Sequence, residues 1–337
     1  MPDAPLLLSS EIPTSSPIKD LAVVGDDPLV VCADWRDAVW TWEPVRDVWR
    51  KRSLAFACAE DPLAAEFPEA ENQIDQVAAT ISGGRVVLAA GHDQQGVAFW
   101  DLESGELLRG TTFIQDYLAA VAIVEGRGPA RFVTAGPNSD VLLLWEAPFD
   151  DSPVLLAEYV HIWSLATTAI NGRSLVAGAD ASGVRVWDLA RTGKELVFEA
   201  TATWAVSWSR LDDRPVVVGA ADPGVLWVWE LPGNDGDRPW GDEPTEPRYE
   251  PITGHDGRIL AMDTATVGGR PLAVTGSEDE TVRVWDLAEG VPAAAPLVGH
   301  RGRVEAVVTA VLHGRDVVLS AGLDGVLRVW DLAAVLR

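Results

Sequence analysis

The sequence predicts an all-β protein in which one structural unit is repeated seven times, in a single domain over residues 1–337. The first observation is a short motif, Gly-Val-Arg-Val-Trp-Asp-Leu at 183–189, that recurs with small variations along the chain. The second is the interval between the motif tryptophans, which is 42 residues at its shortest. These tryptophans are Trp42, Trp100, Trp145, Trp187, Trp229, Trp285 and Trp330. Because internal repeats of this length indicate a repeat architecture, they outweigh chain length in deciding the number of domains.

Three strands can be assigned within each repeat from period-2 alternation and from β-branched residues. In the last repeat they cover 303–312, 315–322 and 326–332, and the earlier repeats follow the same order. Glycine-containing junctions between the first two strands predict hairpin turns. These junctions lie at 83–85, 171–173 and 313–315.

The spacing and the Trp-Asp or Trp-Glu endings resemble the WD40 repeat, and the resemblance extends over essentially the whole chain. It implies a seven-bladed β-propeller whose blades are four-stranded antiparallel sheets. In that family a His, a Ser or Thr, an Asp and the Trp of one blade form a hydrogen-bonded tetrad. Two repeats match it, with His255, Thr275, Asp279 and Trp285 in one and His300, Ser320, Asp324 and Trp330 in the next.

The other five repeats lack the Gly-His pair that precedes the first strand of a complete tetrad. Three of them keep an acid in the turn before the tryptophan, namely Asp93, Asp180 and Asp222. A turn carboxylate can accept hydrogen bonds from nearby backbone N–H groups without a histidine. We therefore expect these blades to be stabilised by packing and by other contacts of their turns.

The two ends of the chain are expected to meet in one blade. The chain stops after the seventh motif, so we expect the strand at 5–10 to complete the last blade and to close the ring. In the first repeat a fourth strand is expected near 52–57, which leaves an acidic insertion at 58–73. That insertion is either a flap for a cationic partner or a solvated loop. A second insertion at 232–251, rich in Pro, Gly and acids, predicts a mobile loop on the opposite face.

Composition narrows the class of partner. The chain has 26 basic and 51 acidic residues, a net charge of −25, so nucleic acid and anionic membranes are expected to be repelled. No apolar run is long enough to span a bilayer, and two cysteines form no disulfide framework, so a cytoplasmic location is expected. The strong preference for Arg over Lys is typical of GC-rich bacteria.

The rim where the innermost strands begin, around the mouth of the central channel, holds the candidate binding residues. Aligning the inner strands places two positions of each on one face, because side chains alternate along a strand. The candidates are Lys19, Gln73, Asp75, Tyr117, His161, Trp163, Trp204, Arg258, Arg303 and Glu305. Trp, Tyr and Arg contribute much of the binding energy at protein interfaces, although Trp163 and Trp204 could instead plug the channel.

Three functions remain open from these residues. The first is a monomeric, non-enzymatic scaffold that binds a protein or peptide at the rim. The second is a small-molecule site at the channel mouth, with His161 as an acid–base group beside Tyr117 and opposite Asp75, Arg303 or Glu305. The third is a structural domain of a larger scaffold, without a defined site. No nucleotide-binding, hydrolase or zinc motif occurs, so no catalytic residue, metal or cofactor is assigned.

Overall fold

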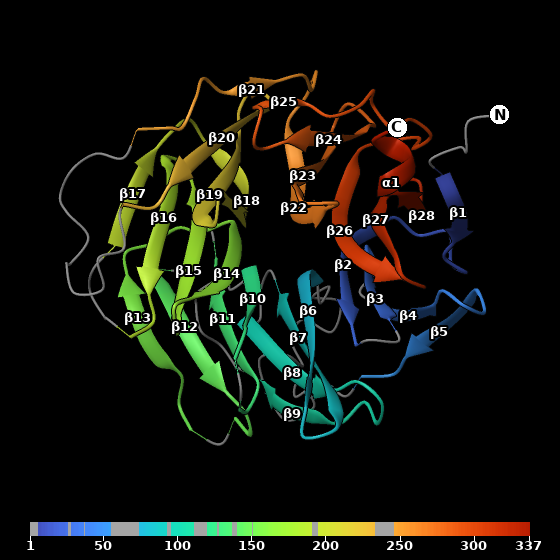
Figure 1. Cartoon of the computed structure of the whole chain (residues 1–337). Coiled ribbons are helices and arrows are strands. Elements are labelled where there is room, and N and C mark those ends of the chain that lie inside the picture. Colours follow the sequence, from blue (N-terminus) through green and yellow to red (C-terminus); the bar gives the residue numbers. More distant parts are fainter. Residues whose placement is uncertain are drawn as a thin grey trace.

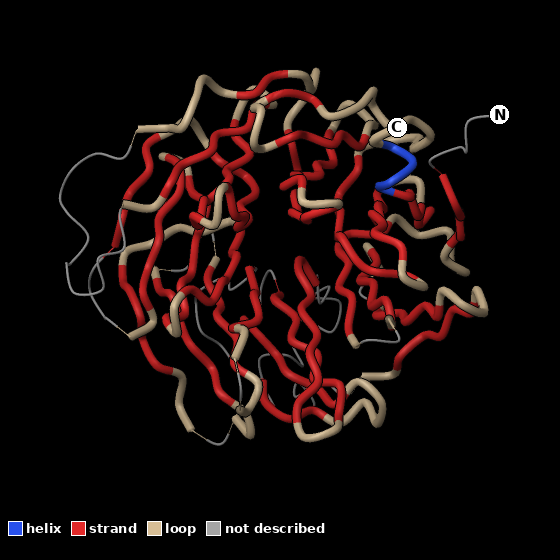
Figure 2. The backbone as a smooth tube through the Cα atoms, in the orientation of Figure 1, coloured by secondary structure: helices blue, strands red, loops and turns tan. Residues whose placement is uncertain are grey.

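A computed structural model of the chain contains seven four-stranded antiparallel sheets arranged around a common axis (Figure 1). It describes residues 6–25, 28–36, 38–54, 74–92, 96–110, 120–126, 128–136, 140–149, 151–190, 195–232 and 246–337. Strands make up most of this backbone, with one short helix, α1 (Leu332–Val335), near the C-terminus (Figure 2). The predicted all-β, seven-bladed propeller is confirmed. In the described residues no helix is long and apolar enough to cross a membrane.

Six blades consist of four consecutive strands ordered from the ring axis outward, and blade 7 consists of three consecutive strands completed by β1. Blades 1 to 4 contain β2 (Ile18–Val24), β3 (Leu29–Asp34), β4 (Val39–Glu43) and β5 (Val48–Arg52); β6 (Ile74–Ser82), β7 (Arg85–His92), β8 (Gly96–Asp101) and β9 (Leu107–Gly110); β10 (Ala120–Val124), β11 (Arg131–Ala135), β12 (Val141–Glu146) and β13 (Val154–Glu158); and β14 (Ser164–Ile170), β15 (Arg173–Asp180), β16 (Gly183–Asp188) and β17 (Glu195–Glu199). Blades 5 to 7 contain β18 (Thr203–Leu211), β19 (Arg214–Ala221), β20 (Val225–Glu230) and β21 (Ile252–Thr253); β22 (Ile259–Val267), β23 (Arg270–Ser277), β24 (Val282–Asp286) and β25 (Val291–Pro292); and β26 (Val304–Leu312), β27 (Arg315–Gly322), β28 (Val326–Asp331) and β1 (Leu6–Glu11).

The hairpins between the first two strands of a blade form where the sequence predicts them. Both central residues have positive φ in the turns Gly83-Gly84, Asn171-Gly172 and His313-Gly314. This conformation matches the twist of the flanking strands and favours glycine or asparagine, which explains the composition of these junctions.

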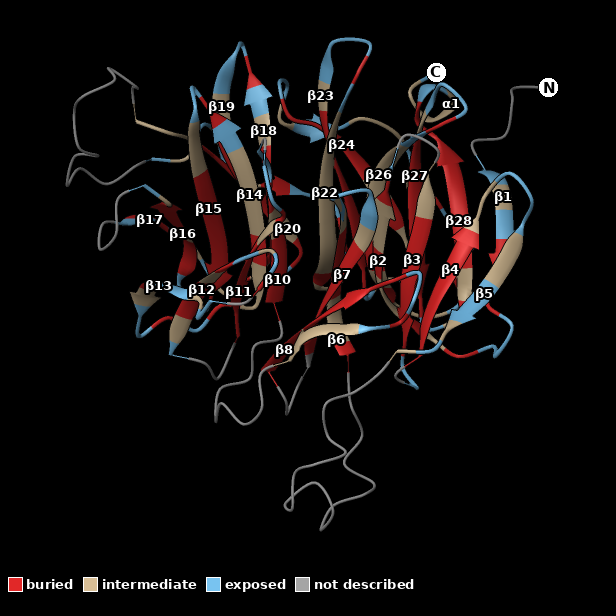
Figure 3. Cartoon of the chain, turned by 90° about the horizontal axis from the view of Figure 1, so that it is seen from below, coloured by how far each residue is buried: buried red, intermediate tan, exposed pale blue. Residues whose placement is uncertain are grey.

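The hydrophobic core lies between neighbouring blades. All seven repeat tryptophans are at most 3% exposed, and each packs in a cluster that draws residues from two adjacent sheets. The second and third strands of the blades are correspondingly mostly buried, whereas outermost strands such as β1 and β5 carry exposed residues (Figure 3). The prediction that these tryptophans form the core is therefore confirmed.

The last blade is closed by the N-terminal strand, as predicted. β1 pairs antiparallel with β28, so the two ends of the chain share one sheet. The outer strand of blade 1 was placed wrongly, because it runs over Val48–Arg52 and not near 52–57. A tight turn at 44–47 returns the chain early, and it is held by Asp47, whose carboxylate accepts the Trp42 indole N–H at 2.8 Å.

The two predicted insertions are described only in part. The acidic insertion at 58–73 lies outside the described residues, as do 233–245 of the second insertion. The described end of the second insertion is attached to the ring, because the Tyr249 hydroxyl donates to the Leu287 carbonyl at 2.9 Å.

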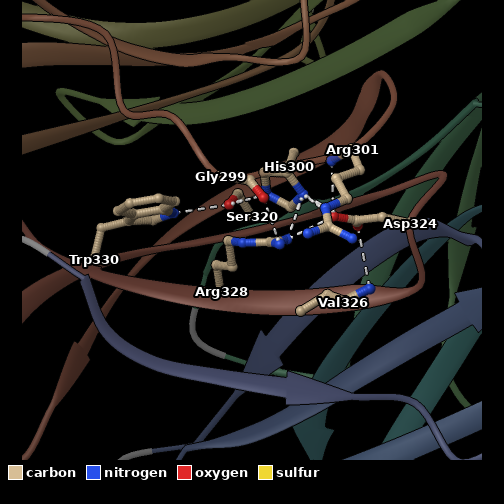
Figure 4. A network of polar contacts seen from close by, with 8 residues as sticks. All are labelled: Gly299, His300, Arg301, Ser320, Asp324, Val326, Arg328 and Trp330. Carbon is tan, nitrogen blue, oxygen red and sulfur yellow. Dashed lines mark hydrogen bonds and ion pairs between the residues drawn. The ribbon is translucent and has the colours of Figure 1, made fainter.

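Both predicted tetrads are present. In blade 6 the His255 ring nitrogens lie 2.8 Å from Asp279 Oδ2 and 2.7 Å from Thr275 Oγ1, which accepts the Trp285 indole N–H at 2.8 Å. In blade 7, His300 and Trp330 contact Ser320 Oγ in the same way, both at 2.8 Å (Figure 4). Arg328 joins this second network by donating to Asp324 and to the Gly299 carbonyl, both at 2.7 Å. The His, Ser, Thr and Trp residues of the tetrads are buried and the two Asp side chains are at most 10% exposed, so the hydrogen bonds offset their lost hydration.

Two blades without the histidine hold their turn acid by a different donor. In blade 1 the Trp40 indole N–H donates to Asp34 at 3.0 Å. In blade 4 the Arg185 guanidinium donates to Asp180 at 2.6 Å. Trp40 and Arg185 occupy the position that Arg328 has in blade 7, two residues before the repeat tryptophan. Other turn contacts therefore replace the histidine in these blades, as expected.

Candidate functional site

The innermost strands all begin at one face of the ring, which we call the mouth face and which lies at the bottom of Figure 3. The loops between the second and third strands of each blade end on the same face, because consecutive strands alternate in direction. Two groups of candidate residues come together here. Gln73 and Tyr117 lie outside the described residues.

The first group is a tryptophan stack of Trp163, Trp204 and Arg258, contributed by blades 4, 5 and 6. The rings of Trp163 and Trp204 are 4.2 Å apart and inclined by 15°. The Arg258 guanidinium carbon lies 4.0 Å from the Trp204 ring centroid. The Trp163 ring and the Arg258 guanidinium both lie too close to the Trp204 ring to occupy the same face of it, so the Trp204 ring lies between them. Each contact of this kind is worth about 0.5–1.5 kcal/mol beyond burial.

Further contacts fix the ends of the tryptophan stack. Arg258 donates to the carboxylate of Asp222, the turn acid of blade 5, at 3.3 Å. The Trp163 carbonyl accepts a bond from the Gln76 side chain of blade 2 at 3.5 Å. The Trp204 indole nitrogen is buried and has no partner among the described residues. Trp204 is therefore the middle member of the stack, and Trp163 and Arg258 form its two ends.

The second group, the Trp35 cluster, consists of Lys19, Trp35, Asp75, Arg303 and Glu305 from blades 1, 2 and 7. Trp35 is 44% exposed, and its backbone N–H donates to the Pro17 carbonyl at 3.0 Å. The Lys19 ammonium and the Arg303 guanidinium lie 5.7 and 5.4 Å from its ring centroid. The exposed indole is thus held in place by two nearby cations without being covered.

Two ion pairs support the Trp35 cluster from the ring interior. Lys19 pairs with Asp75 of blade 2, and Arg303 pairs with Glu305 of its own strand. Burial raises the pKa of Glu305, although the charges of Arg303 and Lys19 act in the opposite direction. Four predicted residues, Lys19, Asp75, Arg303 and Glu305, are therefore brought together.

Trp35 was missed because only the inner strands were aligned for the site. It lies in the turn after β3, directly after the turn acid Asp34. Two features of the sequence could have identified Trp35. It is not one of the repeat tryptophans, and it lies in a loop between second and third strands, which is expected on the mouth face.

His161 lies near an acid other than those considered as its catalytic partners. Its side chain is exposed and lies 3.8 Å from Asp140, which belongs to the preceding blade. Asp75 and Glu305 are instead engaged in the Trp35 cluster. Among the described ranges, no three His, Cys, Asp or Glu side chains are placed to hold a metal ion.

Beneath the rim, polar side chains link successive inner strands. Asp20 of blade 1 accepts the Val77 N–H of blade 2 at 2.7 Å, and Asp263 of blade 6 accepts the Thr309 N–H of blade 7 at 2.8 Å. Burial raises the pKa of Asp20 to about 7 and raises that of Asp263, while the backbone bonds counteract it. These carboxylates connect blades and lie below the exposed surface of the rim.

Comparison with known proteins gives a matching family. The model described as "WD domain, G-beta repeat" matches residues 246–286 and 294–331, which include the two tetrad-containing blades. Human kinesin-like protein KIF21A is 24% identical over 241 residues, covering 69% of this chain and 13% of that protein. Protein groucho of Drosophila melanogaster is 32% identical over 124 residues, covering 36% of this chain and 15% of that protein.

A third relative, transducin-like enhancer protein 2 of Mus musculus, is also 32% identical over 124 residues, and the match covers 36% of this chain and 14% of that protein. The chain therefore spans a small part of the length of the curated relatives that it matches. The matched repeats, the tetrads and the ring of seven four-stranded sheets agree. The chain belongs to the WD40 repeat family.

Proposed function

We propose that this chain is a non-enzymatic scaffold that binds a protein or peptide partner through the mouth face. The observation that carries the proposal is the Trp35 cluster, in which an exposed indole contacts both Lys19 and Arg303. Tryptophan and arginine are enriched at the energetically dominant positions of protein interfaces. The tryptophan stack adds a second rigid aromatic group on the same face.

The rigidity of these groups supports binding. Trp35 lies in a turn whose acid, Asp34, accepts the backbone N–H groups of Arg36 and Ala38 at 2.8 and 3.0 Å. Trp163 is fixed by its stacking on Trp204 and by its backbone bond to Ala179 at 2.9 Å. Side chains that are already ordered lose little conformational entropy when a partner binds, which favours association.

The proposal is tested by quantitative mass spectrometry of proteins retained from a lysate of the source cells. The immobilised wild type is compared with Trp35→Ser and Trp163→Ala, and Val45→Ser serves as the control. Val45 is an exposed apolar residue of blade 1 in the turn between β4 and β5, on the opposite face. We expect a partner that the wild type and Val45→Ser retain equally and that at least one rim variant loses by about tenfold.

Equal retention by all four proteins would contradict the proposal. A small molecule released from the wild type and absent from the rim variants, without any retained protein, would favour the small-molecule reading instead. Thermal unfolding of each variant shows whether the ring remains intact, so that loss of binding is not confused with loss of folding.

A further inference from the structure

We propose that the mouth face of blades 7 and 1 binds an acidic peptide segment that carries a large apolar side chain. The inference deepens the proposed scaffold function and rests on it. The site comprises the exposed apolar side chains of Trp35 and Leu323 together with the cations around them.

Two exposed apolar side chains contact Arg303 at the junction of the two blades. Leu323, 38% exposed, follows β27 of blade 7 and donates its backbone N–H to the Arg303 carbonyl at 3.1 Å. The Arg303 guanidinium lies 5.4 Å from the centroid of the Trp35 ring. Arg303 therefore contacts both the Leu323 backbone and the Trp35 side chain, which offers an apolar group of a partner two exposed apolar side chains in the same region.

Four cations gather around these side chains in an otherwise strongly acidic chain. Lys19, Arg36, Arg301 and Arg303 are four of the 26 basic residues in a chain of net charge −25. Arg36 and Arg301 are exposed next to Trp35 and next to the tetrad histidine, respectively. At physiological salt, charges more than about 8 Å apart are strongly screened, so a local group of cations acts independently of the distant acids.

The carboxylate of Glu305 lies deeper than the arginines of the site. The side chain of Glu305 is 13% exposed, compared with 38% for Arg303, and Arg36 and Arg301 are exposed, whereas Lys19 and Asp75 are 20% and 25% exposed. An approaching partner therefore meets the three arginines before it meets Glu305. Glu278 of blade 6 is exposed and close enough to disfavour the ionised form of Glu305, so it borders the site with negative charge on that side.

Both loops that carry the site are held by buried carboxylates. Asp34 binds the backbone of the Trp35 loop and the Trp40 indole. Asp324 accepts the Arg301 N–H at 3.1 Å within the blade 7 tetrad (Figure 4). The cations are thus presented from fixed loops, which suits charge-complementary recognition of a peptide.

The test selects a phage-displayed library of random dodecapeptides on the wild-type protein. We expect enriched peptides in which Asp and Glu flank Trp, Phe or Leu. We also expect synthetic copies of the enriched peptides to bind the double variant Arg36→Glu/Arg301→Glu at least about tenfold more weakly. Their affinity for the wild type should fall as sodium chloride is raised.

The matched control is Arg46→Glu/Arg214→Glu, which changes net charge equally on the opposite face, where both side chains are strongly exposed. It should bind within about twofold of the wild type, and Glu278→Lys should bind more tightly. Lack of enrichment of acidic peptides, or equal losses in both double variants, would overturn the inference. Neutral or basic peptides that bind the rim and are lost with Trp35→Ser would overturn it while leaving the scaffold function intact.

Discussion

Blades 6 and 7 hold the acid of their outer turn with a buried histidine, whereas blades 1 and 4 hold it with a donor from the third strand. His255 and His300 contact Asp279 and Asp324, while Trp40 donates to Asp34 in blade 1. The turn acid is bonded in all of these blades although the donor differs. The comparison teaches that a blade requires a satisfied turn carboxylate more than it requires a particular histidine, because an unpaired buried carboxylate is costly.

The largest effect is expected on removing the acid of blade 7. Asp324→Ala should lower the free energy of unfolding by about 3–5 kcal/mol, because Arg328 and His300 would be left buried without their carboxylate. Asp180→Ala in blade 4 should cost about 1–2 kcal/mol, since Arg185 keeps its bond to Glu195 and is more exposed. Denaturant titration measures both losses, and equal losses would show that the two networks are equivalent.

The next effect is the pH dependence of stability, which is expected to differ between the turn acids and the carboxylates inside the ring. The Asp279 pKa is lowered to about 2 by its hydrogen bonds with Thr281 and His255, despite the opposing effect of burial. Its contribution to stability is therefore present above about pH 4 and is lost as the pH falls toward 2. Asp20, whose pKa is raised to about 7, behaves in the opposite way. The folded state retains its proton while the unfolded state loses it, so stability falls as the pH rises from about 4 to 7.

Asp20→Asn should abolish that second loss. Asparagine is neutral and keeps an oxygen that can accept the Val77 N–H. The variant should be more stable than the wild type by about 2–4 kcal/mol at pH 8 and nearly equal to it at pH 4. Denaturant titrations of both proteins at pH 4 and pH 8 measure this difference. If the variant and the wild type differed in stability by the same amount at both pH values, the result would be inconsistent with titration of Asp20.

The smallest effect concerns the indole N–H groups of neighbouring blades. Trp285 donates to Thr275, whereas the buried Trp229 nitrogen in blade 5 has no partner among the described residues. Gly219 packs against the Trp229 ring from the strand position that Thr275 has in blade 6, so no hydroxyl is available there. Trp285→Phe should therefore cost about 1 kcal/mol more than Trp229→Phe. The difference in thermal midpoint between these variants is the measurement, and a larger shift for Trp229→Phe would contradict it.

The parts of the fold that depend on local pattern were predictable. The hairpin turns follow from short glycine-containing junctions, and the core tryptophans follow from a repeated motif on one strand of every blade. The outer strand of blade 1 was misplaced because its position depends on how Asp47 closes a turn against Trp42, a contact without a repeating pattern.

The sequence by itself determined a ring of seven repeats, the tetrads of blades 6 and 7 and the closure of the last blade, because each depends on motifs that recur at a regular interval. Only the tertiary structure decided which rim residues meet. Arg303 becomes a neighbour of Trp35 when β1 pairs with β28 and blade 7 comes to lie beside blade 1, whereas Lys19 pairs with Asp75 where blade 2 packs beside blade 1. The first contact depends on ring closure and the second on the packing of neighbouring blades, and alternation along a single strand encodes neither.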